Sequence, residues 1–309
     1  MARQGRLTRD ESSIERSVEA EYQSQPSVPM AIASNPVASY YERKTESILR
    51  RYGPGPLVHF HTGFLDEPAS QTTAAQLRDK LRESQERMLR DSADLWELRR
   101  IAFRQVLDVG CGLGGAAIFW AQEFGSEVTA VTIAPSHVAL VAGFAAEAGV
   151  GLQVHPFLCD AVEVPGKDRF DAIIALDSSC YLSRRAWFRR GAELLRRGGR
   201  MFIADCFVEQ EAYRAPFDRY WCARIGAVEE YLGAARGAGL IFERLEEVSR
   251  LVANFWGTTM ALIRVEAQET GASPARSLKA RESLQVHSLM RRGLLDGGLR
   301  HVLLSFAKP

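Results

Sequence analysis

The fold of this chain is decided by one glycine-rich stretch, Val106-Leu107-Asp108-Val109-Gly110-Cys111-Gly112-Leu113-Gly114-Gly115. Its apolar first half predicts a buried β-strand, and a helical pattern begins at the last glycines and runs to Phe124. Glycine lets the backbone turn tightly and approach a ligand closely, and the first turn of a helix offers free N–H groups. The stretch therefore predicts a strand, a turn and a helix that together hold a cofactor.

Strands and helices alternate over the following hundred residues. Five strands are predicted, at Gln105–Val109, Glu127–Thr132, Leu152–Leu158, Phe170–Leu176 and Gly199–Cys206. Helical patterns separate them, at Gly114–Phe124, Pro135–Ala148 and Arg184–Arg196. Crossover helices demand parallel strands. A final pair of strands, at Phe242–Val248 and His301–Ala307, flanks a helix predicted near Ala275–Leu295. The prediction is an α/β fold with a doubly wound, mostly parallel, seven-stranded sheet.

The segments outside this alternation predict three further parts. Residues 1–35 are polar and contain too few apolar side chains to form a core, so they are predicted to be an N-terminal arm. Residues 36–101 predict a helical N-terminal extension, with helices over 39–51 and 70–101. Residues 102–309 form the predicted core domain, into which an amphipathic helical cap is inserted at about 208–239.

The composition restricts the partners of the protein. The 309 residues are 46% hydrophobic and 25% charged, which is typical of a globular chain with one core. A net charge of +1 gives no argument for nucleic acid or an anionic membrane, so a small molecule is the predicted partner. There is no membrane-spanning apolar run and no signal-peptide pattern. Five cysteines without a CxxC pair favour reduced thiols and a cytoplasmic location.

The glycine spacing distinguishes two classes of cofactor. Dinucleotide enzymes show GxGxxG and an acidic residue at the end of the second strand. Here the spacing is GxGxGG, Asp108 precedes the turn, and the second strand ends at Val131-Thr132-Ile133 without an acid. This arrangement resembles motif I of the class I S-adenosylmethionine-dependent methyltransferases. The resemblance implies a Rossmann-like methyltransferase fold in which S-adenosylmethionine is bound by Asp108, Gly110, Gly112 and Gly114.

The ends of other strands complete the cofactor site that the resemblance implies. The family places an acid after the third strand on the adenine amino group, and Asp160-Ala161 stand there in this chain. A surface-loop aspartate is the alternative. A histidine replaces the glutamine that the family often places near the ribose. The other predicted cofactor residues are Thr132, Ile133, His137 and Leu176.

Four further segments resemble one branch of this family, the sterol, tocopherol and geranyl diphosphate C-methyltransferases. They are SYYERKT (39–45), HFHTGF (59–64), ALDSSCY (175–181) and RIGAVEEYL (224–232). In that branch the paired tyrosines and the histidine turn close over the cofactor, which implies such roles for Tyr40, Tyr41, His61 and Thr62. The alternatives are an amphipathic helix face and buried core histidines. Because strand residues alternate faces, not all of His59-Phe60-His61 are expected to face the site.

The fourth predicted strand ends in the predicted catalytic acid. The branch commonly has a glutamate base at this place, whereas this chain has Asp177, whose side chain is one methylene shorter. The alternative is a structural carboxylate that caps the next helix or holds the Ser178-Ser179 turn. Tyr181 and His61 are the other predicted catalytic residues, and Tyr181 would orient the acceptor or donate a hydrogen bond to it. No acidic cluster suggests a metal-bound diphosphate, so no metal is predicted and geranyl diphosphate itself is disfavoured.

The predicted function is C-methylation of an apolar, prenylated or terpenoid natural product, with prenylated indole alkaloids among the acceptors. Methylation of an alkene leaves a carbocation, which aromatic faces stabilise. Residues 217–221 and 255–256 supply such faces, unless they only pack in the core. The cation then loses a proton or is trapped by ring closure. The alternatives are an O- or N-methyltransferase acting on a bacterial secondary metabolite and a cofactor-binding cyclase that does not methylate.

The arm also predicts association between copies of the chain. A thin apolar stripe runs along it, formed by Ile14, Val18, Tyr22, Val28 and Ile32. Such a stripe is stable only against another surface. We expect the arm to cover its own active site or to cross to a neighbouring subunit, and its exchange between protomers would give a homo-oligomer.

Overall fold

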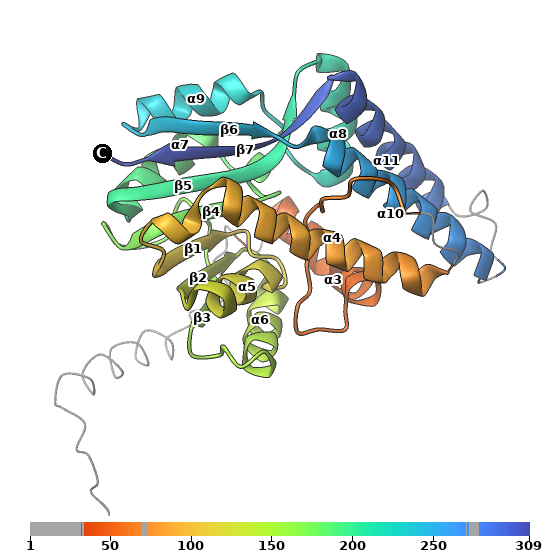
Figure 1. The fold of residues 1–309 in the computed structure, drawn as a ribbon, viewed down its shortest axis with the longest axis horizontal. Coiled ribbons are helices and arrows are strands. Elements are labelled where there is room, and N and C mark those ends of the chain that lie inside the picture. The colour runs from red at the N-terminus through yellow and green to blue at the C-terminus, as the bar shows by residue number, and fades with distance from the viewer. Residues whose placement is uncertain (1–31, 33, 70–72, 270, 272–277) are drawn as a thin grey trace, which may run out of the picture.

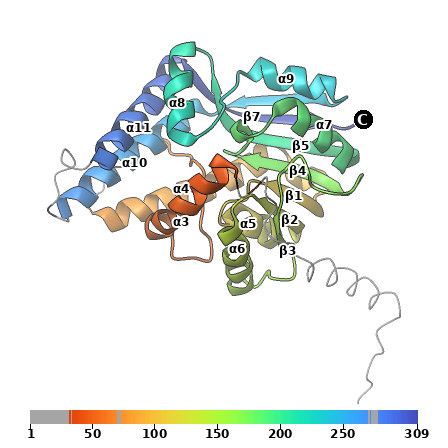
Figure 2. The same ribbon diagram turned by 180° about the vertical axis from the view of Figure 1, so that it is seen from behind.

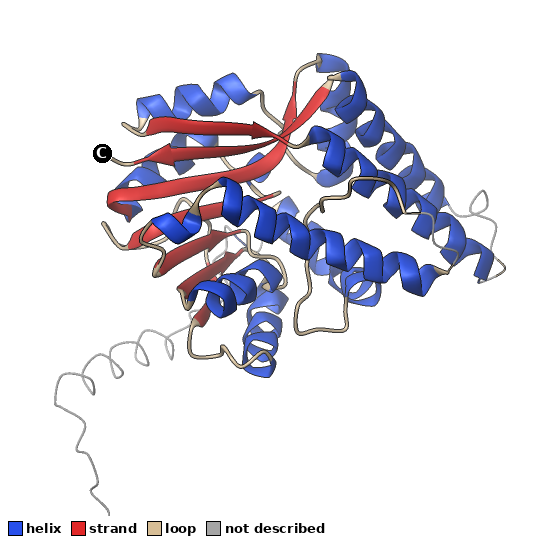
Figure 3. Cartoon of the chain, viewed as in Figure 1, coloured by secondary structure: helices blue, strands red, loops and turns tan. Residues whose placement is uncertain are grey.

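The computed structural model of this chain describes residues 32, 34–69, 73–269, 271 and 278–309. Its centre is a seven-stranded sheet in the order β3-β2-β1-β4-β5-β7-β6 (Figure 1; Figure 3). The strands are β1 (Gln105–Val109), β2 (Glu127–Thr132), β3 (Val154–Leu158), β4 (Phe170–Leu176), β5 (Leu195–Val208), β6 (Ile241–Glu247) and β7 (Leu299–Ala307). The predicted doubly wound, mostly parallel sheet is confirmed.

Helices cover both faces of the parallel part of the sheet. One face carries α4 (Ala74–Leu95), α5 (Gly115–Phe124) and α6 (Pro135–Glu147), and the other carries α7 (Arg184–Leu194) and α9 (Val228–Gly237). Every residue of β4 is buried, as expected for a strand that is covered on both faces. Its alternate side chains enter separate cores: Ala172 and Ile174 enter one, and Ile173 and Ala175 enter the other.

The last strand, β7, enters between β5 and β6 and runs antiparallel to both. Its register places His301 opposite Cys206, near the end of β5. Because β5 ends where β7 begins, His301 lies at the same edge of the sheet as the carboxyl ends of the parallel strands. Those carboxyl ends are where open α/β sheets bind ligands.

A second group of helices lies beside this edge (Figure 1; Figure 2). It consists of α4 together with α3 (Pro36–Tyr52), α8 (Arg214–Trp221), α10 (Ser249–Glu269) and α11 (Leu278–Asp296). Helix α10 packs against α11 and α4, and α11 packs against α8. Of these helices, α3 and α4 belong to the predicted extension, 36–101, and α8 belongs to the predicted cap, about 208–239, whereas α10 and α11 lie outside both segments.

The helical segments differ from the prediction in three places. The segment 208–239 contains two short helices, of which α8 joins the cap while α9 packs against α7 on the sheet. The helix predicted over 70–101 ends at Leu95 and is followed by a short 3₁₀ turn (Leu98–Arg100). Helix α10 was not predicted, although its buried side chains recur every three or four residues, as in an amphipathic helix: Val252, Phe255, Thr259, Leu262 and Ile263.

The predicted arm, residues 1–35, lies outside the described residues except for Ile32, Ser34 and Asn35. Asn35 caps α3, because its side chain accepts a hydrogen bond from the N–H of Val37 at 2.9 Å. None of the described helices is long and apolar enough to cross a membrane. All five cysteines are free thiols, three of them buried.

Candidate active site

The glycine turn leaves β1 with a backbone that only glycine adopts easily. Gly110, Gly112 and Gly114 all have positive φ, at +72°, +55° and +83°. A side chain at Gly110 would meet Ser178, and one at Gly114 would meet Val141, so these two glycines allow close packing. A Cβ at Gly112 would meet nothing within 4 Å. The space above Gly112 is therefore open for a ligand.

Asp108 stands just before this turn with no partner for part of its carboxylate. The side chain is 2% exposed, and its Oδ2 accepts no hydrogen bond from any residue that the structure describes. Burial raises the pKa of Asp108 to about 7. A buried carboxylate without a donor is costly unless a ligand supplies one. The open cradle at Gly112 and this carboxylate together fit the amino-acid portion of S-adenosylmethionine.

The remaining predicted cofactor residues lie along the same edge of the sheet. Thr132 ends β2, is buried, and accepts a hydrogen bond from the N–H of Ala134 at 3.1 Å, with Ile133 between them. Asp160 follows β3, and its Oδ1 accepts a hydrogen bond from Val162 N at 3.1 Å. That bond also fits the alternative of a turn-forming loop aspartate. Ala161 and Leu176 are buried at the ends of β3 and β4.

Helix α3 is fixed over the start of α6 by polar contacts. Thr45 Oγ1 lies 2.9 Å from Nε2 of His137, and Glu42 accepts a hydrogen bond from Ser136 N at 2.9 Å. Burial lowers the pKa of His137, so its neutral imidazole is favoured. His137, which replaces the family's glutamine, thus has Thr45 as a partner in this structure.

Tyr41 joins α3 to the end of the fourth strand. Its hydroxyl donates a hydrogen bond to the hydroxyl of Tyr181 at 2.9 Å, and its ring packs edge-on against His137. Burial raises the pKa of both tyrosines, so both hydroxyls are protonated. Tyr40 is also buried, and its hydroxyl has no partner among the described residues. These two tyrosines line the cavity described below, beyond a simple role in helix packing.

The histidine segment runs against the start of α5. A Cβ on Gly115 would meet Nδ1 of His59 and the carbonyl of Val58 at 2.6 Å, so glycine allows this close approach. His61 Nε2 lies 3.3 Å from Nδ1 of His59, while Gln85 donates a hydrogen bond to the His61 carbonyl at 2.7 Å. Burial lowers the pKa of both histidines. The segment is not a strand, yet among the two histidines only His61 lines the cavity.

Asp177 is bonded on both carboxylate oxygens. Its Oδ2 accepts from the Thr62 N–H at 2.6 Å and from the Thr62 hydroxyl at 2.8 Å, and its Oδ1 lies 3.0 Å from His301 Nε2. Burial pushes the pKa of Asp177 up, but the adjacent His301 and the Thr62 N–H outweigh burial and hold it below its usual value. Asp177 is therefore an anion directly beside the cavity.

The helix-capping alternative for Asp177 does not match this geometry. The residue before α7 is Ser183, and no side chain caps that helix. Asp177 instead has a φ of +46°, in the left-handed region, where a side chain is strained. Strain of this kind at the end of a strand, with the carboxylate turned to Thr62 and His301, is typical of functional positions.

A second buried carboxylate, Asp205, lies at the end of β5. It accepts hydrogen bonds from Ser179 Oγ at 2.5 Å, from Cys180 N at 3.0 Å and from Cys206 N at 2.8 Å. Burial and then the charge of Asp177 raise the pKa of Asp205 to about 6. Its bonds hold the turn that carries Tyr181, so Asp205 is a positioning residue for that tyrosine.

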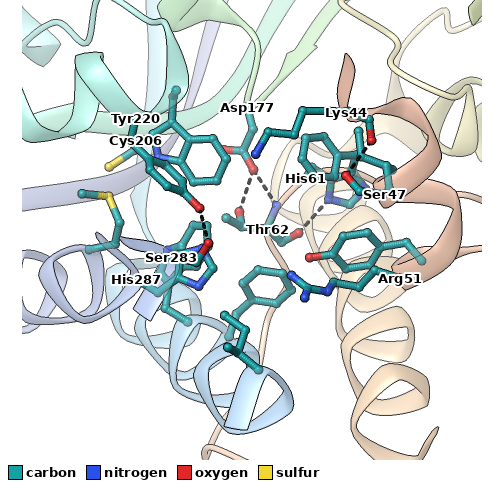
Figure 4. Close-up of a pocket in the computed structure, with 18 of the residues that line it drawn as sticks. Lys44, Ser47, Arg51, His61, Thr62, Asp177, Cys206, Tyr220, Ser283 and His287 are labelled. Atoms are coloured by element: carbon teal, nitrogen blue, oxygen red, sulfur yellow. Dashed lines mark hydrogen bonds between the residues drawn. The ribbon is translucent and has the colours of Figure 1, made fainter. Parts of the chain in front are cut away.

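These groups surround a cavity of about 660 Å³ between the sheet edge and the helical cap (Figure 4). The floor contains Thr62, Asp177, Asp205 and His301. The side toward α8, α10 and α11 is aromatic, formed by Phe217, Tyr220, Trp221, Phe255, Trp256 and His287. The glycine turn and Asp160 do not line this cavity, whereas Tyr40, Tyr41, His61 and Thr62 do. The contact of these four residues with the cofactor stays a prediction from the sequence.

Three residues of this site were missed by the sequence reasoning. His301 lies at the start of a predicted strand, and its pairing with the end of β5 was the signal that could have found it. Asp205 lies near the end of β5, as Asp177 follows β4, and strand-end position was its signal. His287 carried no signal, because its place depends on how α11 packs against Trp221 and Trp256. No three His, Cys, Asp or Glu side chains among the described residues are placed to hold a metal ion.

Known methyltransferases resemble this chain in sequence and in fold. A family model described as a methyltransferase domain matches residues 106–199. The chloroplastic tocopherol O-methyltransferase of Arabidopsis thaliana is 27% identical over 282 residues, which cover 81% of this chain and 76% of the relative. A solved geranyl diphosphate methyltransferase, in complex with GPP and sinefungin, aligns with a TM-score of 0.74 at 19% identity, over 88% of this chain and 98% of that one. The [4+2]-cyclase SpnF aligns with a TM-score of 0.70 at 22% identity, over 92% and 98%.

Proposed function

Because this chain is a class I S-adenosylmethionine-dependent methyltransferase of the branch that its sequence resembles, we propose that it methylates a carbon atom of an apolar acceptor. The proposed acceptors are prenylated or terpenoid natural products, with prenylated indoles among them. S-adenosylmethionine, when bound, supplies an electrophilic methyl group. The residues of the chain align the acceptor with it and control the charge that develops on the acceptor.

The aromatic side of the cavity carries this proposal. Trp221 and Trp256 lie with ring centroids 5.9 Å apart, and His287 packs against both, at 6.4 Å and 4.8 Å. Burial lowers the pKa of His287 to about 3, so the imidazole is neutral at physiological pH. A neutral, π-rich surface of this size suits a prenyl chain, and a cavity of about 660 Å³ is in the range of small-molecule sites.

The same surface suits the charge that C-methylation creates. When an alkene carbon forms a bond to the methyl group, the S–CH₃ bond breaks and the neighbouring carbon becomes a cation. Aromatic faces stabilise a desolvated cation by roughly 2 kcal/mol or more. The anionic Asp177 on the floor of the cavity adds a favourable charge. The site therefore stabilises the charge from two directions.

Asp177 also provides a place for the proton that the cation releases. Its carboxylate is ionised, and Thr62 holds it against the cavity at 2.6 Å and 2.8 Å. Loss of a proton from the carbon next to the cation gives an alkene and a protonated Asp177. Where a nucleophilic carbon of the acceptor lies close to the cation, ring closure quenches the charge instead, and the proton leaves from the new ring.

O-methylation is the second candidate function. The tocopherol relative is named an O-methyltransferase, and an ionised Asp177 beside His301 would take a proton from an acceptor hydroxyl equally well. The likeness to a [4+2]-cyclase keeps a third candidate open, a cofactor-binding cyclase that does not methylate. Only C-methylation requires the aromatic surface to face a cation.

Incubation with methyl-labelled S-adenosylmethionine and a panel of prenylated indoles, prenylated phenols and plain phenols tests the proposal. C-methylation predicts label on carbon of the prenyl acceptors and none on the plain phenols. Mass spectrometry and the carbon NMR shift of the labelled methyl group identify the atom that receives it. Label on oxygen or nitrogen alone, or cyclised product without label, would refute it.

A further inference from the structure

The lining of the cavity includes a cation, Lys44, that has no ionic partner in the described part of the chain. Lys44 projects from α3, and its Nζ lies 5.1 Å from the centroid of the Tyr40 ring and 5.8 Å from that of Tyr220. Figure 4 shows this side chain reaching from α3 toward the side of the cavity that Tyr220 occupies. No carboxylate of the described residues lies within ion-pairing distance of Lys44 Nζ, in contrast to the two arginines beside it.

The neighbours of Lys44 increase the positive charge. Arg51 and Arg78 share one carboxylate, Glu266, at 2.9 Å and 2.8 Å, which leaves this group with an excess of one positive charge. Lys279 also lines the cavity. Burial, then Lys279, lower the pKa of Lys44, and the charge of Glu282 opposes them only in part. A half-buried ammonium among other cations is stabilised by an oxygen acceptor placed beside it.

The charges that line the cavity differ between the sheet edge and the helices. The sheet edge contributes the carboxylates of Asp177 and Asp205. The helices contribute five cations and two carboxylates: Lys44, Arg50, Arg51, Arg78 and Lys279, and Glu266 and Glu269. With a purely hydrocarbon acceptor, Lys44 would keep its contacts to the rings of Tyr40 and Tyr220 but would have no carboxylate partner among the described residues. A molecule with an oxygen-bearing head and a prenyl tail would give Lys44 an oxygen acceptor and place the tail against the aromatic side chains.

On these observations we infer that Lys44 binds a hydrogen-bond-accepting oxygen on the head group of the acceptor and so directs the prenyl tail toward Asp177. The oxygen belongs to an anionic group, such as a carboxylate or phosphate, or to a neutral carbonyl. Lys44 is a specificity residue in this scheme, and it takes no part in the methyl transfer itself. The inference rests on the proposed apolar acceptor, but its test requires no turnover.

Three matched ligands separate the possibilities: farnesoic acid, methyl farnesoate and farnesene. Their tails are alike, and their heads carry an anion, a neutral carbonyl and no oxygen. Binding to the full-length chain, without a methyl donor, is followed through the fluorescence of the tryptophans, two of which line the cavity. We expect the wild type to bind the oxygen-bearing ligands more tightly than farnesene.

The variants Lys44→Met and Lys44→Arg then test the residue. Lys44→Met should lose tenfold or more in affinity for the oxygen-bearing ligands, which is about 1.4 kcal/mol, and should keep its affinity for farnesene. A loss for the acid alone identifies an anionic head, and a loss for both acid and ester identifies a carbonyl. Lys44→Arg should keep the preference. Lys80→Met, at an exposed lysine of α4 that pairs with Glu83, is the control and should bind all three as the wild type does.

Equal affinities of Lys44→Met and the wild type for all three ligands would overturn the inference. So would an equal loss for farnesene, because the lysine would then act only through its aliphatic stem. Thermal unfolding checks each variant, and Lys44→Gln repeats the comparison if the methionine variant is unstable. A failure of the proposed C-methylation would show in the labelled products and would leave these binding constants unaffected.

Discussion

Asp177 combines a strained backbone with a carboxylate that is bonded at both oxygens, which makes it the most informative single residue to change. Asparagine tolerates the left-handed backbone and has nearly the same size. Asp177→Asn should therefore fold, but it loses the negative charge and presents an N–H₂ group to Thr62 or His301. We expect kcat to fall at least tenfold, about 1.4 kcal/mol of transition-state stabilisation, with the affinity for S-adenosylmethionine nearly unchanged.

The control for this variant is a change at Asp171, at the opposite end of β4 from Asp177. Asp171 accepts hydrogen bonds from Gln105 N at 2.9 Å and from Arg196 at 2.7 Å, away from the cavity. Asp171→Asn should lower the melting temperature and leave kcat unchanged. A stable Asp177→Asn enzyme with full activity would show that the carboxylate has no role in the reaction.

Asp205 gives a pH dependence of stability that is opposite in sign to that of a carboxylate whose pKa is lowered by folding. Its pKa is raised to about 6, above the unfolded value of about 4, so the folded state binds the proton more tightly than the unfolded state does. The stability of the wild type relative to Asp205→Asn should fall as pH rises from about 4 to about 6. Urea denaturation of both proteins across this range measures the difference.

Asp171 again supplies the comparison, because its pKa is lowered, with burial outweighed by the Gln105 N–H and Arg196. The wild type should gain stability over Asp171→Asn as pH rises through about 4. If the stability of the wild type relative to Asp205→Asn and relative to Asp171→Asn changed with pH in the same direction, the raised pKa of Asp205 would be contradicted.

Site residues could be predicted where a motif or a strand end marks them. Asp108 lies near the end of a predicted strand, the glycines and Asp177 follow predicted strands, and their position alone placed them at the ligand-binding edge. His301 and Asp205 had the same kind of signal in a less direct form. His287 and Lys44 had none. The ring stacking across α8, α10 and α11 depends on tertiary packing, and so does the absence of a carboxylate of the described residues beside Lys44 Nζ.

At the level of elements, the hydrogen bond between the hydroxyls of Tyr41 and Tyr181 adds to the other polar contacts that dock α3. In Tyr41→Phe the hydroxyl of Tyr181 loses its partner while it stays buried, and this costs about 1–3 kcal/mol. Tyr181→Phe should cost about as much. The double variant should cost less than the sum of the two, since both polar groups are gone.

Urea denaturation of the four proteins measures this coupling. Tyr213→Phe is the control, because its hydroxyl donates to Asp296 at 2.6 Å, in a different part of the chain. The loss in free energy of unfolding caused by Tyr213→Phe should add to the loss caused by Tyr41→Phe without any coupling between the two. Additive effects of Tyr41→Phe and Tyr181→Phe would contradict the hydrogen bond between the two hydroxyls and the docked position of α3.

The elements themselves were predicted best where crossover helices enforce parallel strands. The strands β1 and β4 follow the sequence pattern because their side chains are buried on both faces. The cap was predicted less well. Helix α10 lies between a predicted strand and a predicted helix. The 208–239 segment breaks at Cys222, which has a φ of +55°, and the glycine of this break, Gly226, follows only four residues later.

At the scale of the whole molecule, association through the arm stays a prediction from sequence. The described residue of its stripe, Ile32, is buried, and the arm leads directly into α3. Deletion of residues 1–31 should reduce the number of subunits per particle, as measured by light scattering. It should also weaken the binding of S-adenosylmethionine, because α3 is predicted to close on the cofactor cradle. A truncated chain with the same number of subunits and the same affinity for S-adenosylmethionine as the full-length protein would refute this role of the arm.

The central claim is that the turn after β1 holds S-adenosylmethionine beside the aromatic cavity, and calorimetric titration of the cofactor into two glycine variants tests it most directly. Gly112→Ala and Gly125→Ala both place a side chain at positive φ, +55° and +64°, with nothing within 4 Å of the new Cβ. Each should cost about 1–2 kcal/mol of stability. Only Gly112→Ala should weaken the binding of S-adenosylmethionine, by tenfold or more, and NAD should bind to none of the proteins. Equal affinities of the two variants for S-adenosylmethionine, or tight binding of NAD in its place, would contradict the account.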